Sequence, residues 1–318
     1  MTPNPNTRHM TTHRLLVLGL SLLCLTVNSA TLSGQPRAAS TDRDPRWSAI
    51  RRVFGQLGEA HDGYFRVNLP RSDLTVRIGS DVLETPFEFT SYIGFVPVGT
   101  NDVLAMGEYV LRDDEVATVM GELRREGIST PALHNHLIGE SPRIMYIHVM
   151  VRGPAESVAT KLKAAFEKSA TPMKAEAESP PAADWSAVDA ILGKHSEAEG
   201  HVAEYEFPRR EHLTIDGTAV KSSGLLETSS EVVFQQLGNG RVACGGELFV
   251  ASNEIDAVGR ALEEHGLHVT AIHNHMVDQT PHLYWMHWYG TGEAATLARG
   301  VAAALEHTNG ARKSAGEE

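Results

Sequence analysis

The chain has 318 residues, enough for two domains of ordinary size, and 42% of them are hydrophobic, which suits packed globular cores. Its 40 acidic residues outnumber 28 basic ones, so the formal net charge is -12. That charge repels phosphate backbones and anionic membrane surfaces, and a nucleic-acid partner is therefore not expected.

The N-terminus has the organisation of a secretory signal peptide. A basic segment, an apolar run and small residues follow one another: Arg8 and Arg14, then residues 15–27, then Ser29 and Ala30. The apolar run is too short to span a membrane. Residues 1–30 are therefore predicted to be a signal peptide, and the protein to be exported, periplasmic or secreted, without stable membrane insertion.

The chain contains two cysteines. Cys24 lies inside the apolar run, but Leu22 and Leu23 precede it where a lipid-acceptor cysteine normally follows a small residue, so lipid anchoring is not expected. After cleavage Cys244 is the remaining thiol and has no partner for an internal disulfide. We expect it to be buried and inert.

The rest of the chain contains an internal repeat. ALHNHLIGESPRIMYIH at residues 132–148 aligns without a gap with AIHNHMVDQTPHLYWMH at residues 271–287. Upstream, the Gly-Glu pair ending at Glu108 matches the pair ending at Glu247. Such self-similarity predicts two copies of one structural unit.

Composition places the boundaries of the copies. A stretch rich in Pro, Ala, Ser and Glu separates them and is typical of a linker, and the chain ends in a polar tail. The predicted divisions are a first repeat over residues 44–168, a linker over 169–183, a second repeat over 184–308 and a flexible tail over 309–318.

In chain order, each copy predicts the same elements. An amphipathic helix comes first, beginning near Trp47 or Trp185, and two or three short strands follow it. Next come a strand with the Gly-Glu pair, a helix closed by Gly127 or Gly266, a hairpin carrying the histidines, and a final helix. The predicted class is α+β, with helices packed on an antiparallel sheet and a ferredoxin-like second half in each copy.

The hairpin predicts where the histidines point. Residues two apart in a strand share a face, so His134 and His136 project together. A hairpin register that places Tyr146 opposite His134 adds His148 to the same face and leaves Leu133 on the core side. The second copy has the same pattern in His273, His275 and His287, with Trp285 opposite His273. The asparagine between each pair of histidines then needs a partner or a bulge.

Three imidazoles on one face, with a carboxylate nearby, suit a divalent transition metal, zinc first. We therefore expect two metal sites, one in each copy, each assisted by Glu108 or Glu247 as a fourth ligand or as a catalytic general base. The sites would be His134, His136 and His148 in the first copy, and His273, His275 and His287 in the second.

Other interpretations of these residues stay open. The histidines are also compatible with a solvated or structural sheet face, or with a metal-free groove that binds a small cell-envelope ligand with Tyr146 or Trp285. Arg71 and Arg209 could bind an anionic ligand, although arginines more often hold loops together. Whether the protein is an enzyme is not decided; a metal-dependent hydrolase or lyase acting on a small sugar-derived or acyl substrate is the enzymatic alternative.

The combination of a Gly-Glu pair, a helix, the ALHNH stretch, a proline and a third histidine in MYIH, present in tandem, resembles the LppY/LpqO family of bacterial domains of unknown function. The resemblance extends over about residues 44 to 308. It implies an exported bacterial protein made of two such domains. It implies no activity, substrate or oligomeric state.

Overall fold

The computed structural model describes residues 44–174, 180–223, 226 and 228–310. The predicted signal peptide lies outside these residues, as do part of the linker and most of the tail. No helix in the described part of the chain is long and apolar enough to cross a membrane.

The first repeat begins with a short helix, α1 (Pro45–Phe54), that is capped at both ends. Helix α1 has Pro45 in its first turn, and the side chain of Asp44 accepts a hydrogen bond from the Arg46 backbone N–H. Gly55 ends the helix with a φ of 66°, where a residue without Cβ is favoured. The helix buries Trp47, one of the two tryptophans that mark the start of the copies.

The first repeat then continues through strands and two further helices. Its elements are α1 (Pro45–Phe54), β1 (Gly58–His61), β2 (Tyr64–Pro70), β3 (Val76–Ile78), β4 (Asp81–Leu83), β5 (Thr90–Val98), β6 (Asp102–Arg112), α2 (Val116–Arg125), β7 (Ser129–His134), β8 (Glu140–Ser141), β9 (Ile144–Pro154) and α3 (Ala155–Phe166).

The second repeat has the same succession of elements. They are α4 (Ser186–Leu192), β10 (Glu197–Glu199), β11 (Val202–Pro208), β12 (Leu213–Ile215), β13 (Thr218–Val220), β14 (Ser229–Gly238), β15 (Arg241–Val250), α5 (Ile255–Glu263), β16 (His268–Asn274), β17 (Gln279–Thr280), β18 (Tyr284–Gly292) and α6 (Ala294–Leu305).

Both repeats form a six-stranded antiparallel sheet with the same strand order. The orders are β1-β2-β5-β6-β9-β7 and β10-β11-β14-β15-β18-β16. Within the first, β6, α2, β7, β9 and α3 follow one another in the ferredoxin-like arrangement, because β9, the hairpin partner of β7, inserts between β6 and β7. The fold class and the tandem duplication predicted from the sequence are confirmed.

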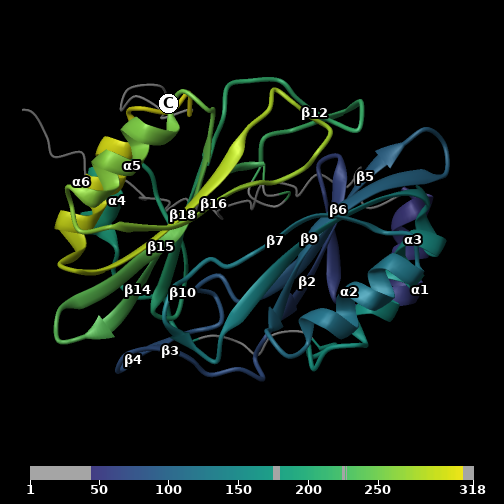
Figure 1. Cartoon of the computed structure of the whole chain (residues 1–318), viewed down its shortest axis with the longest axis horizontal. Coiled ribbons are helices and arrows are strands. Elements are labelled where there is room, and N and C mark those ends of the chain that lie inside the picture. Colours follow the sequence, from purple (N-terminus) through teal and green to yellow (C-terminus); the bar gives the residue numbers. More distant parts are fainter. Residues whose placement is uncertain (1–43, 175–179, 224–225, 227, 311–318) are drawn as a thin grey trace, which may run out of the picture. The chain divides into compact units, whose positions relative to one another are not determined.

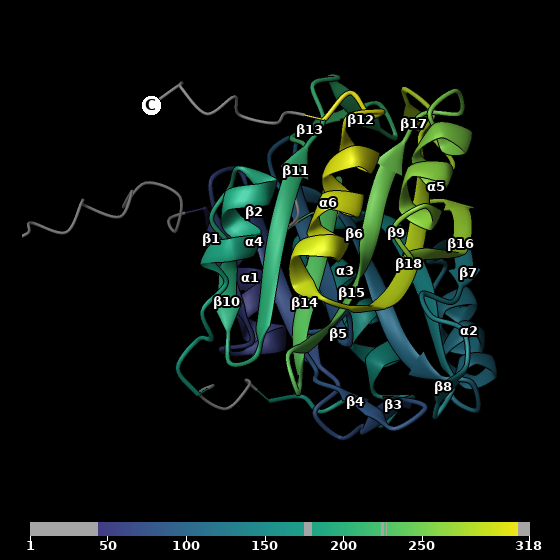
Figure 2. The same cartoon turned by 90° about the vertical axis from the view of Figure 1, so that its left-hand side faces the viewer.

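Helices cover one face of each sheet (Figures 1 and 2). In the first repeat α1, α2 and α3 enclose a core with the sheet, and in the second α4, α5 and α6 do the same. Cys244 lies fully buried in the second core, as predicted, and burial raises the pKa of its thiol.

The opposite faces of the two sheets share a further core that the sequence did not predict. Phe87 and Tyr146 of the first repeat belong to one buried cluster with Val202 and Val233 of the second. Phe87 also packs edge-on against Tyr289, with ring centroids 6.2 Å apart. A fully buried phenylalanine stabilises a fold by about 1.5–3 kcal/mol, so this shared core joins the repeats.

Two small sheets extend the contact between the repeats. They have the orders β4-β3-β8 and β13-β12-β17. The side chain of Gln235 in β14 donates to the carbonyl of Val82 at 2.9 Å and accepts from the N–H of Glu84 at 2.8 Å. Arg241 of the second repeat also pairs with Asp81 of β4 at 2.9 Å. The two small sheets also reach the histidine hairpins, because β8 pairs with β3 and β17 pairs with β12. Each hairpin thus contains an extra short strand that pairs outside its main sheet.

One packing prediction is wrong. Leu133 was expected in the core, but its side chain is 47% exposed, whereas Ile147 opposite it is fully buried. The reason is that β7 is the edge strand of its sheet, while β9 lies in the interior between β6 and β7.

Candidate metal centre

The hairpin register brings the histidines onto the shared face. Tyr146 lies opposite His134, and Trp285 lies opposite His273, as the sequence predicted. Because β9 also pairs with β6, His148 lies opposite Glu108. In the second repeat the same pairing sets His287 opposite Glu247. The Gly-Glu pairs therefore reach the histidines through direct strand pairing.

The glycine before each glutamate is needed where its strand pairs with the neighbour on the other side, β6 with β5 and β15 with β14. A Cβ on Gly107 would lie 2.2 Å from the Tyr92 carbonyl oxygen, and one on Gly246 would lie 2.3 Å from the Glu231 carbonyl oxygen. A glycine inside a strand often marks such a close approach of two backbones. The repeated Gly-Glu pair thus allows two strands to approach closely and presents a carboxylate on the next residue.

The histidines of the two repeats meet each other. The rings of His134 and His273 stack with centroids 3.6 Å apart, and those of His136 and His287 lie 3.8 Å apart. His148 meets His275 edge-on at 4.3 Å. The sequence predicted two separate triads, one in each copy. The structure instead places all six imidazoles in one cluster between the two sheets.

Within this cluster two groups have nitrogens near enough to hold one ion. They are His134, His136 and His287, and His134, His148 and His273, with ligand atoms within 4.8 Å of one another in each group. Both groups combine residues of the two repeats, and both use His134. A site built from these groups would belong to neither repeat alone.

Glu108 lies among the three histidines that the first repeat brings to the cluster. Its Oε2 atom is 3.5 Å from Nε2 of His134 and 3.5 Å from Nε2 of His136, and those two nitrogens are 3.2 Å apart. The same oxygen is 3.3 Å from Nε2 of His148. Oε2 of Glu108 has no hydrogen-bond partner among the described residues. In the second repeat the corresponding contact is longer, 4.0 Å from Glu247 to His287.

These separations match a tetrahedral metal site. Zinc ligands lie about 2.0–2.1 Å from the ion, so two ligands of one tetrahedron are about 3.3 Å apart. His134, His136 and Glu108 have nearly that spacing before any ion is considered. Buried polar atoms without a partner are uncommon in proteins and call for an ion, a water or a strained contact. The donor set, imidazole nitrogens with one carboxylate, is one that zinc sites in proteins use.

Burial keeps most of the imidazoles neutral. It lowers the pKa of His273 to about 4 and that of His275 to about 3, and it lowers the pKa values of His134, His148 and His287 well below the usual range. Neighbouring imidazoles add to the effect. A neutral imidazole offers the lone pair that a metal needs, so these residues are ready to bind one at neutral pH.

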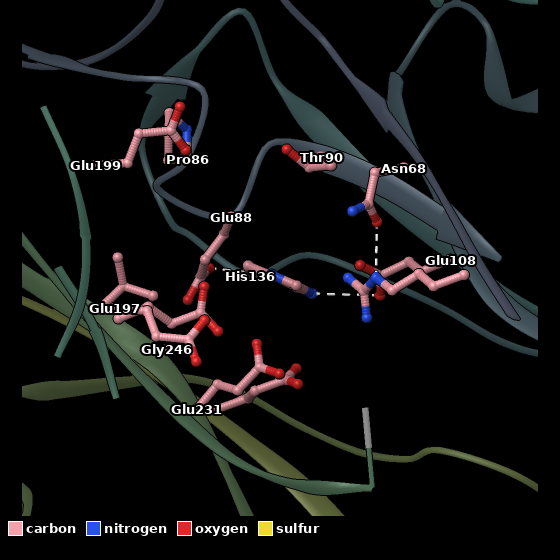
Figure 3. Close-up of a pocket in the computed structure, with 14 residues that line it drawn as sticks. Asn68, Pro86, Glu88, Thr90, Glu108, His136, Glu197, Glu199, Glu231 and Gly246 are labelled. Carbon is pink, nitrogen blue, oxygen red and sulfur yellow. Dashed lines mark hydrogen bonds and ion pairs between the residues drawn. The ribbon is translucent and has the colours of Figure 1, made fainter. Parts of the chain in front are cut away.

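His136 differs from the others. Burial alone would lower its pKa, but the carboxylates of Glu108 and Glu88 outweigh burial and raise it to about 10. Its Nδ1 lies 3.0 Å from Oε2 of Glu88 (Figure 3). A carboxylate on the second nitrogen of a metal-binding histidine fixes the ring and raises its basicity. Without metal, the same contacts hold a proton on His136.

Glu88 was not predicted from the sequence. It is a non-glycine residue with a φ of 70°, a conformation that costs folding energy and is retained where the surrounding structure enforces it. The ring of Tyr146, whose hydroxyl donates to the Glu88 carbonyl, stacks on His136 at 3.4 Å. One signal was available, because the repeat spacing aligns Glu88 with Glu227. Glu227 lies outside the described residues.

The remaining candidate residues have structural partners. Trp285 packs against Phe249 and edge-on to His275, with ring centroids 5.3 Å apart, so it encloses the cluster as Tyr146 does. Arg71 is fully buried and bonds to Glu115 and Asp73. Arg209 makes the equivalent contacts with Glu254 and Glu211. Both arginines hold loops together, the alternative to anion binding.

The asparagines of the two His-Asn-His stretches tie the repeats together. Nδ2 of Asn135 donates to the carbonyl of Leu137 at 2.8 Å and to that of Thr270, in the other repeat, at 3.4 Å. Nδ2 of Asn274 donates to the carbonyl of Pro131 at 3.0 Å. The asparagines therefore have the partners that the sequence required, and these partners connect the edge strands β7 and β16.

A cavity of about 250 Å³ opens beside the cluster (Figure 3). His136, Glu108 and Glu247 form part of its wall. Further lining residues come from both repeats: Arg66, Asn68, Pro86, Glu88, Thr90, Glu197, Glu199, Glu204, Glu231, Val233 and Gly246. A small molecule in this cavity would therefore lie next to the histidines.

Comparison with known proteins places the chain in a family. The model of the Domain of Unknown Function family DUF1259 matches residues 48–168 and again residues 186–307. The chain belongs to this family and carries its domain twice. No curated protein matches the sequence.

The chain also has a remote likeness to two solved structures. One is a trimeric bacterial microcompartment shell protein, PduB, with 12% identity and a TM-score of 0.20, over 79% of this chain and 90% of that one. The other is the fused permuted hexameric shell protein MSM0275 from the RMM microcompartment, with 10% identity and a TM-score of 0.17, over 67% of this chain and 86% of that one. These TM-scores are too low to support an argument about function.

Proposed function

We propose that the protein binds one divalent transition metal ion per chain, zinc first, in a site that the two repeats build together. The ligands would be His134, His136 and Glu108 from the first repeat and His287 from the second. An ion held by the other group would use His134 as well, which is why we propose one ion and not two.

One observation carries this proposal. The unpartnered, buried Oε2 of Glu108 lies 3.5 Å from two imidazole nitrogens that are themselves 3.2 Å apart. This spacing is that of ligands around a tetrahedral ion. Charge supports it too, because burial keeps the imidazoles of His134 and His287 neutral, and neutral imidazoles beside a carboxylate favour a cation.

The test is the metal content of the protein, purified without a histidine tag and measured by plasma mass spectrometry. We expect one zinc per chain, and its complete loss in a His287→Gln variant although three ligands from the first repeat remain. His282→Gln removes an exposed histidine of the same hairpin and should keep the metal. Absence of metal from the parent protein after equilibration with zinc would refute the proposal and favour the metal-free ligand-binding module.

The shared cavity favours a second, enzymatic function for the same site. A bound zinc ion lowers the pKa of a coordinated water, and this supplies a nucleophile for hydrolysis or elimination. Glu247 lines the cavity, and its carboxylate lies 4.0 Å from His287, so we propose it as the general base. A Glu247→Gln variant should keep its zinc and lose turnover of small esters and amides. Unchanged turnover would exclude this role.

We further infer that the protein acts outside the cytoplasm and that it is a member of the LppY/LpqO group suggested by its motifs. Both inferences rest on the sequence, since residues 1–30 lie outside the described part of the chain. Mass spectrometry of the protein recovered from its natural host tests the first: a chain beginning near residue 30 supports export, and one beginning at residue 1 or 10 contradicts it.

A further inference from the structure

The cavity beside the histidines has a charge that the proposed metal site does not explain. Among the lining residues that the structure describes, seven are glutamates: Glu88, Glu108, Glu197, Glu199, Glu204, Glu231 and Glu247. The cationic side chains in the same lining are Arg66 and, without metal, the protonated His136. Arg66 donates from Nε to Asn68 at 2.6 Å and lies over the Tyr92 ring at 4.3 Å. The cavity is thus strongly acidic.

The glutamates of the second repeat form a row across its sheet. Glu197 lies directly opposite Glu204, Glu206 opposite Glu231, and Glu231 opposite Glu247. Side chains of directly opposed residues are close neighbours on one face, and like charges there are destabilising. Such a row concentrates negative charge on one face of the sheet, and a concentration of negative charge favours a positively charged ligand.

The first repeat does not carry this row. At the corresponding positions of its sheet, Glu108 lies opposite Tyr92, Tyr92 opposite Asn68, and Arg66 opposite Glu59. The two copies have therefore diverged along this face while both keep their histidines and the Gly-Glu pair. As a result, the cavity wall that the second repeat forms is acidic, whereas the wall that the first repeat forms carries acidic, neutral and basic side chains.

One of the glutamates has an oxygen that the proposed metal site does not use. Oε1 of Glu88 has no hydrogen-bond partner in the described structure, and the Glu88 side chain is 9% exposed. At the other end of the row, burial raises the pKa of Glu204; Arg66 partly opposes this, and Glu197 and Glu206 add to it. Both ends of the cavity thus favour a cation.

The length of the row excludes a single metal ion as its ligand. Calcium ligands lie about 2.3–2.6 Å from the ion, so the oxygens that hold one ion must converge. Glu197 in β10 and Glu247 in β15 are separated by three steps between neighbouring strands, about 14 Å. A ligand that contacts both ends must be elongated and carry more than one positive charge.

We propose that this cavity binds a linear polyamine or a similar elongated organic polycation. One ammonium end lies at Glu197 and Glu204, and the other lies at Glu88. This inference goes beyond the metal site and does not require an ion there. If the site is enzymatic, it also gives the substrate class, a molecule with an amine-bearing chain.

The test is calorimetric titration with spermidine at physiological ionic strength, about 0.15 M. We expect one spermidine per chain, weaker binding of the shorter putrescine, and no binding of neutral triethylene glycol. A Glu197→Gln/Glu204→Gln variant should bind spermidine roughly tenfold more weakly, which corresponds to about 1.4 kcal/mol. The matched control is Glu263→Gln/Glu264→Gln, which removes the same charge from exposed positions at the end of α5.

Equal weakening in both variants would show general electrostatic attraction and would overturn the proposal, as would equal affinity for spermidine in the parent and the cavity variant. A circular dichroism spectrum of each variant confirms that it is folded before titration. Titrations of chelator-treated and zinc-equilibrated protein separate the two proposals. Spermidine binding by the zinc-free protein supports the polycation proposal even if the protein binds no metal. Zinc binding without spermidine binding supports the metal site and overturns the polycation proposal.

Discussion

Replacing Gly107 by alanine tests how the Gly-Glu pair positions Glu108. The added Cβ would lie 2.2 Å from the Tyr92 carbonyl oxygen and 2.9 Å from Cα of Ile93. Ordinary contact begins near 3.4 Å, so β5 and β6 must separate locally by about 1.2 Å. Overpacking costs about 1–3 kcal/mol, and a stretched ladder hydrogen bond adds about 1 kcal/mol. We expect Gly107→Ala to lower the free energy of unfolding by about 2–4 kcal/mol.

Urea denaturation, followed by tryptophan fluorescence, measures this change through the midpoint and slope of the transition. Gly121→Ala in α2 is the control, because a Cβ there meets nothing within 4 Å. Alanine in a helix is favoured over glycine, so this variant should gain about 0.5–1 kcal/mol. An unfolding midpoint for Gly107→Ala equal to that of the parent protein would refute the close-approach explanation. Displacement of Glu108 should also reduce the bound zinc.

Three further results are expected. Asn274→Ala removes the hydrogen bond to the Pro131 carbonyl and should cost about 1 kcal/mol in the same denaturation assay; no loss would show that the bond contributes nothing. Arg209→Met leaves the partly buried Glu254 without its guanidinium partner and should cost about 3–5 kcal/mol, and a cost under 1 kcal/mol would argue against the loop-holding role. Partial burial would raise the pKa of Glu211, but hydrogen bonds from Arg209 outweigh it and lower that pKa to about 2. The carboxylate form is favoured by folding, so this contribution is present above pH 4.5 and is lost as the pH falls towards 2. The stability lost between pH 4.5 and pH 2 should be smaller in Arg209→Met than in the parent protein, as measured by thermal unfolding across that pH range.

The sequence predicted the parts of the site that depend on local periodicity. Alternation in a strand was enough to set His134 and His136 on one face, and turn length was enough to place Tyr146 opposite His134. The repeat itself revealed the importance of the Gly-Glu pair. These features follow from residues close in sequence or from the comparison of one copy with the other.

What the sequence did not predict depends on how the two sheets pack. The stacking of His134 on His273 joins residues 139 positions apart, and no periodic pattern specifies such a contact. The role of Glu88 depends on a loop with an unusual φ, and the exposure of Leu133 depends on β7 being an edge strand. The meeting of the two histidine triads in one cluster was not predicted for the same reason, because it depends on contacts between the copies.

The central claim is that one metal ion is bound jointly by both repeats. Crystals grown with zinc, with diffraction data collected on both sides of the zinc absorption edge, test it most directly. The account predicts one anomalous peak per chain, between the sheets, within about 2.0–2.2 Å of ligand atoms from His134, His136, Glu108 and His287. Two peaks, each surrounded by histidines of a single repeat, or no peak in the histidine cluster, would contradict it.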